Sequence, residues 1–226
     1  RGANRSRAVD VLVAEALQLA ERHPEIVLTG IHIGTYGRDL GSSLGALVER
    51  LVRAVPQARF RLSSVEATEV DAQLVEFFQE PAHLAPHLHA PLQSGSDRVL
   101  KRMGRHWYSA GAYAAAVERI AAPLSVFGLG ADVMAGFPGE SDADHAETMA
   151  LVAALPFTYL HVFPYSTRPG TAAERLEGHV AGERIQRRAR ELRDAGEAKA
   201  RDHRRRRAGT TADLIVVRRD IREGVT

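Results

Sequence analysis

The chain has 226 residues with 45% apolar residues, 26% charged residues and a formal net charge of +2, a composition that excludes general disorder. It contains no cysteine, which excludes disulfides, thiolate nucleophiles and cysteine-ligated zinc or iron–sulfur sites within these residues. No apolar run reaches the length of about 18 residues that a membrane span needs, so we expect a cytoplasmic protein.

Hydrophobic periodicity predicts helices and strands in alternation. The expected helices span residues 9–20, 44–52, 70–78, 109–121 and 182–207, and further helices begin near Ser96 and at Ser141. The expected strands span residues 25–31, 59–64, 87–93, 125–135 and 157–164. Asp144, three residues after Ser141, has the spacing of a capping box, with Asp in place of Glu or Gln.

This alternation predicts βαβ units and a parallel sheet, arranged as a partial barrel or a doubly wound sheet. A sixth strand at residues 212–219 breaks the rhythm. We therefore expect an α/β domain over residues 1–208 and the beginning of a second domain over residues 209–226.

Chemistry in parallel α/β folds lies at the carboxyl ends of the strands. Small and hydrogen-bonding residues follow all five predicted strands, in the segments 29–37, 63–66, 91–97, 130–140 and 163–171. A single loop of this composition needs no ligand to explain it, because turns between strands and helices require Gly and Pro. Five together predict a large polar ligand that lies across the strand ends, where glycines let backbone groups approach it.

Common nucleotide-binding and hydrolase motifs are missing from the sequence. It has neither a phosphate-binding P-loop nor a nucleophile elbow, and Val133 stands where a dinucleotide fingerprint beginning at Gly128 requires its third glycine. His87 and His89 face the same side of a strand, but no third metal ligand is evident, which favours a structural or substrate-contact role. Trp107 is expected to pack in the interior.

Positive charge gathers near the C-terminal end. Between Arg184 and Arg207, ten arginines and one lysine stand against four acidic residues, a local net charge of +7. A solvated helix face and an RNA contact are evenly balanced interpretations of this stretch. The RNA interpretation is centred on Arg204, Arg205, Arg206 and Arg207, which neutralise phosphates in that case.

Three segments resemble the signatures of radical S-adenosylmethionine methylthiotransferases, namely residues 89–105 (HAPLQSGSDRVLKRMGR), 132–140 (DVMAGFPGE) and 165–171 (YSTRPGT). Residues 1–7 resemble the stretch that follows the family's Cys-x-x-x-Cys-x-x-Cys loop. Ala90 departs from the family's usual leucine. Residues 28–39 are most similar to the branch that modifies N6-threonylcarbamoyladenosine, since the isopentenyladenosine branch carries Gln-Asn where this chain has Ile31 and His32.

The resemblance implies a partial (βα)6 radical-SAM barrel that lacks its first strand, followed by the start of a small β-barrel, a TRAM-like RNA-binding domain. It also implies an internal segment of a longer enzyme, because the cysteine loop and the family's N-terminal domain are not in the sequence. We expect this segment alone to be inactive and to bind S-adenosylmethionine weakly or not at all.

The implied activity of the full-length enzyme is the addition of a methylthio group to C2 of N6-threonylcarbamoyladenosine beside the tRNA anticodon. The implied cofactors are S-adenosylmethionine and two [4Fe–4S] clusters, with cluster ligands outside this chain, and the implied partners are tRNA and an electron donor. Within the family, an isopentenyladenosine tRNA or a ribosomal-protein aspartate could be the substrate instead. Outside the enzyme class, the competing hypothesis is a cluster-free RNA-binding module.

The resemblance also implies contacts with S-adenosylmethionine. The implied residues are Thr29 and Gly30 at its methionine end, Ser64, Glu66 and Gln93 at the methionine or ribose, and Asp132, Gly136 and Tyr165 along the adenosine. It implies no catalytic residue and no metal ligand in this chain.

Overall fold

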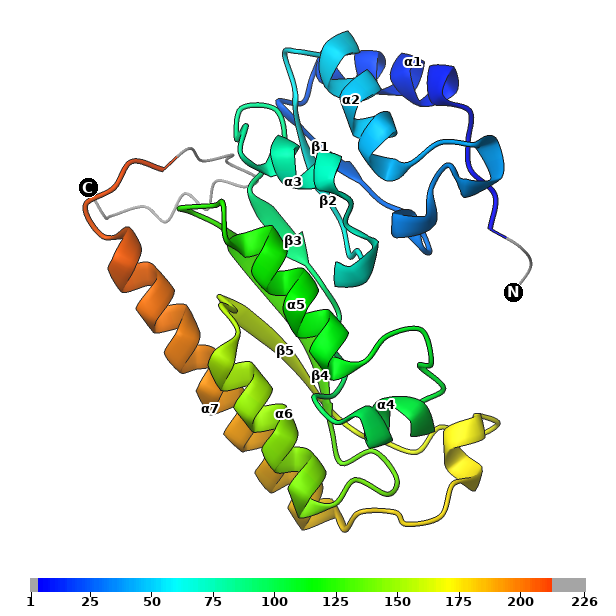
Figure 1. Cartoon of the computed structure of the whole chain (residues 1–226), viewed down its shortest axis with the longest axis vertical. Helices are drawn as coiled ribbons and strands as arrows, with labels where there is room; N and C mark the ends of the chain where they lie inside the picture. The colour runs from blue at the N-terminus through cyan, green and yellow to red at the C-terminus, as the bar shows by residue number, and fades with distance from the viewer. Residues whose placement is uncertain (1–3, 213–226) are drawn as a thin grey trace, which may run out of the picture.

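The computed structural model describes residues 4–212 (Figure 1). Parallel strands alternate with helices in the predicted order. The strands are β1 (Glu25–Leu28), β2 (Arg59–Leu62), β3 (His87–His89), β4 (Gly128–Ala135) and β5 (Tyr159–Pro164). The helices are α1 (Val9–Ala20), α2 (Leu44–Ala54), α3 (Ala72–Phe78), α4 (Asp97–Arg102), α5 (Ala110–Ala121), α6 (Asp142–Ala154) and α7 (Gly182–Arg207).

The strands follow one another across the sheet in chain order. β1 pairs with β2, β3 pairs with β4, and β4 pairs with β5, all in parallel. Single parallel bridges connect the two groups, between Phe60 and Leu84 and between Ser64 and His89. Because a doubly wound sheet reverses its strand order, this sequential order identifies the partial barrel among the two predicted architectures.

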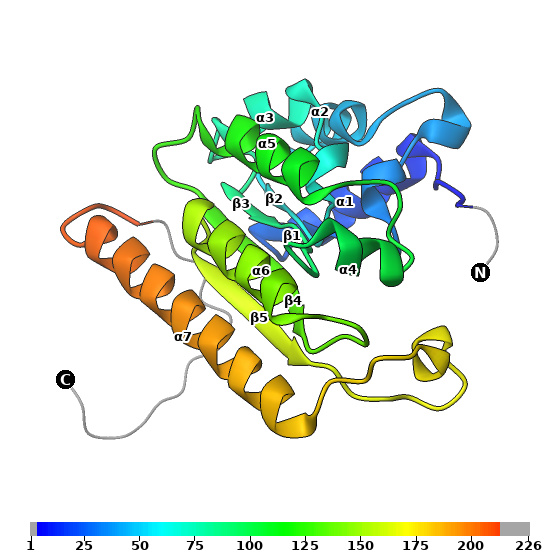
Figure 2. The ribbon, with the colours of Figure 1, turned by 60° about the horizontal axis from the view of Figure 1, so that its bottom comes forward.

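Strand alternation separates an apolar outer face from a polar inner face. On β4, Leu129, Ala131 and Val133 are fully buried and belong to the core. The helices α2, α3, α5, α6 and α7 follow this outer side of the curved sheet (Figure 2). Between these residues, Asp132 points to the opposite side, where His161 of β5 stands in register with it. No helix of the described residues has the length and apolarity that crossing a bilayer requires.

The helix ends follow the sequence closely. Ser141 accepts a hydrogen bond from the Asp144 backbone N–H, and the Asp144 carboxylate accepts one from the Ser141 backbone N–H. The capping box with Asp at its third position is therefore confirmed. The strand expected at 212–219 lies, beyond its first residue, outside the described residues, so the domain boundary at residue 208 stays a prediction.

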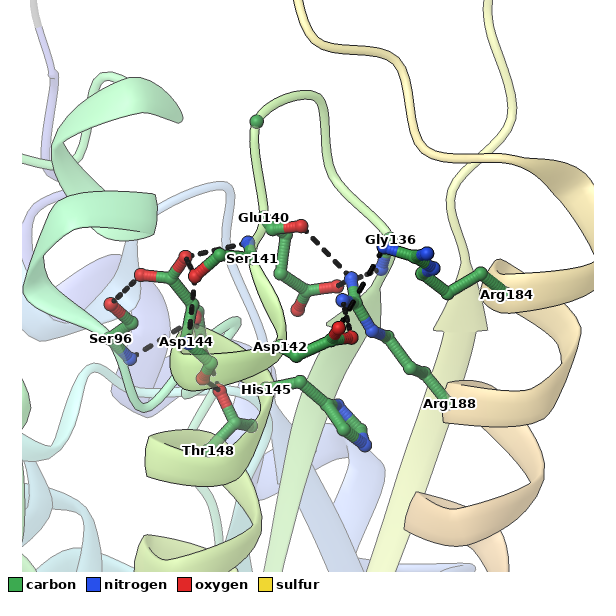
Figure 3. A network of polar contacts seen from close by, with 12 residues as sticks. Ser96, Gly136, Glu140, Ser141, Asp142, Asp144, His145, Thr148, Arg184 and Arg188 are labelled. Atoms are coloured by element: carbon green, nitrogen blue, oxygen red, sulfur yellow. Dashed lines mark hydrogen bonds and ion pairs between the residues drawn. The ribbon is translucent and has the colours of Figure 1, made fainter.

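A buried ion pair fastens α7 to the loop between β4 and α6. Arg188 is the largest fully buried side chain of the described residues. Its Nη1 lies 2.7 Å from Glu140 Oε2, and its Nη2 lies 2.6 Å from Asp142 Oδ1 (Figure 3). Glu140 Oε2 also accepts the backbone N–H of Gly136 at 2.7 Å. This arginine, counted above among the basic charges of residues 184–207, is therefore not available to a polyanion.

Removal of the Arg188 guanidinium leaves Glu140 buried without its counter-charge. Arg188→Ala should lower the free energy of unfolding by about 3–5 kcal/mol, whereas Arg190→Ala, on the exposed side of the same helix, should change it by less than about 0.5 kcal/mol. Urea denaturation of both variants measures the difference. Equal stability of the two variants would show that the ion pair does not hold α7 in place.

Candidate ligand-binding site

The loops that follow the strands are joined to one another by backbone hydrogen bonds. The Gln93 N–H donates to the carbonyl of Asp132 at 2.7 Å, and the Met134 N–H donates to the carbonyl of Gln93 at 2.9 Å. Beyond them, the Tyr165 N–H donates to the carbonyl of Ala135 at 2.8 Å. These bonds bring Gln93, Asp132 and Tyr165 to the end of β4, and the bridge between Ser64 and His89 places Ser64 on the other side of β3.

Gln93 has an unusual backbone at the centre of this edge. Its φ of 67° makes it the one non-glycine residue with positive φ among the described residues. A side chain in this region costs on the order of 1–3 kcal/mol and persists where the surroundings enforce it, most often at functional sites. Here the two hydrogen bonds to β4 hold Gln93 in this backbone conformation, and they keep it beside Asp132.

The segment after Gln93 is held against the N-terminal turns of α6. The Gly95 N–H donates to Thr148 Oγ1 at 3.0 Å, and Ser96 Oγ donates to Asp144 Oδ1 at 2.7 Å. A Cβ at position 95 would lie 2.6 Å from the Thr148 Cα, so only glycine permits this approach. Asp144 thus joins Ser96, in the segment after β3, to α6 (Figure 3). It is also bonded to Arg98 of α4.

Glu66 and Trp107 lie on either side of Arg105. The Arg105 Nη1 pairs with Glu66 Oε1 at 3.2 Å, and burial raises the pKa of Glu66 although Arg105 opposes the shift. The Arg105 guanidinium carbon lies 5.5 Å from the centroid of the Trp107 ring. The expectation that Trp107 packs in the interior is wrong, because the residue is 58% exposed.

Gly136 and Tyr165 serve the loop that follows β4. The Gly136 N–H is occupied by Glu140, and a Cβ at this position would lie 2.4 Å from the Ile185 Cγ1 of α7. The Tyr165 ring meets Phe137 edge to face, with its hydroxyl buried and without a partner among the described residues. The need for glycine at 136 is explained by α7, and its contact with a ligand stays a prediction.

Thr29 and Gly30 lie apart from the β3–β5 loops. They line an open hollow of about 700 Å³ beside β1, together with α1 and residues near the N-terminus. Ile31 follows them and is 87% exposed. Of the predicted ligand contacts, the structure therefore brings Gln93, Asp132 and Tyr165 together around the end of β4. Ser64 stands opposite His89 and, because the Ser63 N–H donates to the carbonyl of Leu28, lies beside Thr29 and Gly30 at the ends of β1 and β2.

A chain of polar side chains crosses the inner face. The Tyr159 hydroxyl lies 2.9 Å from His87 Nε2 and 3.1 Å from His89 Nδ1, and His89 Nε2 lies 3.0 Å from Asp132 Oδ1. Burial lowers the pKa of His87 to about 4, with help from Arg61, so this ring is neutral at pH 7. The hydrogen bond from His89 lowers the pKa of Asp132 although burial opposes it.

His161 completes this group. Its Nδ1 lies 3.3 Å from Asp132 Oδ1, so His89 does have neighbours of metal-ligand type, contrary to the sequence interpretation. Sequence reasoning misses Tyr159 and His161 because only the register of β4 against β5, with Asp132 opposite His161, places them there. The available signal in the sequence is that Tyr159 and His161 are two residues apart on a predicted strand and therefore face the same side of the sheet.

Comparison with known proteins yields no matching family model but many similar sequences. The chain is 40% identical over 177 residues to threonylcarbamoyladenosine tRNA methylthiotransferase MtaB of Thermotoga maritima, covering 78% of this chain and 41% of the relative. It is 34% identical over 219 residues to MtaB of Aquifex aeolicus, covering 96% and 53%. A tRNA-2-methylthio-N(6)-dimethylallyladenosine synthase of Cereibacter sphaeroides is 41% identical over 179 residues, covering 78% and 41%. The chain thus spans about half the length of these curated relatives.

Solved structures show the same fold at low sequence identity. Coproporphyrinogen III oxidase of Escherichia coli, a radical SAM enzyme, superposes with a TM-score of 0.63 at 17% identity, covering 84% of this chain and 45% of that one. The radical S-adenosylmethionine methyltransferase TsrM of Kitasatospora setae gives 0.56 at 14% identity, covering 70% and 31%. The fold is therefore the radical SAM fold.

The Asp144 carboxylate makes the folding stability of the chain depend on pH. Burial opposes its ionisation, but hydrogen bonds from Arg98, Ser141 and Ser96 outweigh burial and lower its pKa. Because the pKa of Asp144 is lower in the folded chain than in the unfolded chain, its ionisation stabilises the fold at pH values above the unfolded-state pKa of about 3.9. This stabilisation is lost as the pH falls below that pKa. Asp144→Asn should therefore cost about 2 kcal/mol at pH 7, and the deficit should narrow toward pH 3.

Thermal or urea unfolding between pH 7 and pH 3 measures this deficit. Asp10→Asn, which changes an exposed carboxylate on α1, is the matched control and should follow the unsubstituted chain throughout. An Asp144→Asn deficit that stayed constant from pH 7 to pH 3 would show that ionisation of Asp144 does not stabilise the loop.

Proposed function

Because this chain and the curated tRNA methylthiotransferases belong to one family over the segment they share, we propose that it forms the S-adenosylmethionine-binding barrel of an enzyme that adds a methylthio group to C2 of N6-threonylcarbamoyladenosine in tRNA. The observation that carries this proposal is the polar edge formed by Gln93, Asp132 and Tyr165 around the end of β4. The sequence signatures that match the family lie at this edge, with residues 89–105, 132–140 and 165–171 all beginning on a strand or just beyond it.

The residues at the edge suit S-adenosylmethionine. Its ribose hydroxyls and ammonium group need acceptors, and Asp132, Glu66 and the Gln93 side chain offer them. Both contacts of Asp132 are made by Oδ1, which leaves Oδ2 for a ligand. The Tyr165 hydroxyl is enclosed by protein atoms and lacks a partner among the described residues, so a ligand hydroxyl or nitrogen would pair with it only after neighbouring side chains move.

A [4Fe–4S] cluster does not fit the residues of this chain, because the sequence contains no cysteine. The proposed enzyme takes its radical and its methyl group from S-adenosylmethionine, with two clusters bound by cysteines that lie outside these 226 residues. It also requires an electron donor. We place this reaction in the cytoplasm, where tRNA is modified.

Two basic groups at opposite ends of α7 are candidates for tRNA phosphates. Exposed Arg184, Arg187 and Arg190 line a small hollow at the N-terminal end of the helix, which follows the β5 loop. Arg204, Arg205 and Arg206 are exposed at the other end, about 39 Å along a helix of 26 residues. Arg207 is half-buried and donates to the carbonyl of Thr211. Only the first group lies at the strand-end edge, where the modified nucleoside must arrive.

The Cereibacter relative is named for the product 2-methylthio-N(6)-dimethylallyladenosine, which keeps isopentenyladenosine as a second candidate substrate. The two substrates differ in charge, because the threonylcarbamoyl group carries a carboxylate. A ribosomal-protein aspartate is the third candidate substrate, and a cluster-free RNA-binding role is the fourth hypothesis. One experiment separates all four.

Mass spectrometry of tRNA nucleosides tests the proposed activity. Expression of the full-length protein in cells without their own methylthiotransferases should convert N6-threonylcarbamoyladenosine to its 2-methylthio derivative. Asp132→Ala should lower the yield at least tenfold, and Arg22→Gln, on the surface after α1, should leave it unchanged. Methylthio-isopentenyladenosine would identify the second substrate. Unmodified tRNA with a methylthiolated ribosomal protein, or with no product at all, would contradict the proposal.

Salt dependence of tRNA binding separates the two basic groups. Each phosphate contact contributes roughly 0.7–0.9 to the slope of log affinity against log salt. A triple variant that replaces the first group should reduce the magnitude of this slope by about 2; its substitutions are Arg184→Gln, Arg187→Gln and Arg190→Gln. A second triple variant, with Gln at Arg204, Arg205 and Arg206, tests the remote end of the helix.

The control for these variants is Arg22→Gln, Arg50→Gln and Arg53→Gln, three exposed arginines on or beside α1 and α2. Slopes that are the same in the control and in both α7 variants would leave the basic stretch a solvated helix face.

A further inference from the structure

The group of His89, Asp132 and His161 on the inner face has the composition of a metal site. These side chains come from three adjacent strands, β3, β4 and β5, and one ligand atom from each lies within 4.8 Å of the other two. His89 Nε2 lies 3.0 Å and His161 Nδ1 lies 3.3 Å from Asp132 Oδ1. We propose that these three residues bind a divalent transition-metal ion of the zinc type.

The separations agree with such an ion. Zinc bonds of about 2.0–2.2 Å to nitrogen and oxygen in a tetrahedral site place neighbouring ligand atoms about 3.4 Å apart. The distances of 3.0 and 3.3 Å to Asp132 Oδ1 therefore need only small movements to admit the ion. Two imidazoles with one carboxylate favour zinc, cobalt, nickel, copper and iron over magnesium and calcium, which prefer oxygen ligands throughout.

The group is oriented as metal ligands are. The second ring nitrogen of His89, Nδ1, is bonded to the Tyr159 hydroxyl at 3.1 Å, which fixes the ring with Nε2 toward Asp132. The Tyr159 hydroxyl is itself bonded to His87 Nε2 at 2.9 Å. The rings of His89 and His161 have centroids 5.0 Å apart and are tilted by 32°. Supported ligands of this kind are characteristic of built metal sites rather than of chance surface clusters.

The site is open on the side that faces away from the helices. The His161 side chain is 57% exposed and that of Asp132 is 26% exposed, so an ion bound by the three ligands keeps positions for water or a substrate atom. Without an ion, the same residues form a trio around Asp132 Oδ1, in which His89 Nε2 is hydrogen-bonded to this oxygen and His161 Nδ1 lies within ion-pair distance of it. Metal binding distinguishes these two states, and it does so independently of the proposed methylthio transfer.

The test is metal binding by the untagged 226-residue chain, whose lack of cysteine leaves only nitrogen and oxygen ligands. Zinc titration in a calorimeter should give one equivalent of tight binding, and cobalt should produce visible absorption of a site with nitrogen and oxygen ligands. His161→Ala should weaken zinc binding at least 30-fold, and Asp132→Asn should do the same. Magnesium should not compete.

His106→Ala is the matched control, because His106 is an exposed histidine outside the group, and it should change zinc affinity less than twofold. His161 is itself largely exposed, so its replacement keeps the fold, which circular dichroism verifies. Zinc binding that is absent from the unsubstituted chain, or that is equal in His161→Ala and His106→Ala, would overturn the proposal and leave a polar trio.

Discussion

The parallel pairing of five strands in chain order is the constraint on which the rest of the molecule depends. It places every strand end at one edge, and it gives each strand one side that faces the helices and one that does not. On β4, this alternation buries Leu129, Ala131 and Val133 among apolar neighbours and turns Asp132 to the inner face. The apolar outer side supplies stability, and the polar inner side is thereby left for a ligand.

Side chains on the helices hold the strand-end loops in position. Asp144 at the start of α6 holds the segment after β3, and buried Arg188 of α7 holds the segment after β4 through Glu140. Glu140 lies in the short connection between β4 and α6, and Asp144 lies in the first turn of α6 that follows it (Figure 3). A ligand that lies across the edge would therefore meet loops that are already held in position, which reduces the ordering cost of binding.

The sequence predicts the elements well because helix and strand periods and capping residues are local. The predicted order of helices and strands is confirmed, as is the capping box at Ser141 and Asp144. The contacts of the inner face are not local, because His161 reaches Asp132 only through the register of β4 against β5. Counting charges assigns Arg188 to a basic surface, since a count cannot tell which face of α7 is buried. Residue type alone assigns Trp107 to the core, whereas it lies exposed beside Arg105.

The central claim is that the edge after β2–β5 binds S-adenosylmethionine in the full-length enzyme. Photo-crosslinking of a cluster-loaded preparation with an azido-adenosyl analogue of S-adenosylmethionine, followed by peptide mass spectrometry, tests it most directly. We predict adducts within residues 130–140 and 163–171, along which the adenosine is expected to lie, and their suppression by an excess of S-adenosylmethionine. Suppressible adducts confined to α7 or to the hollow beside β1 would contradict it.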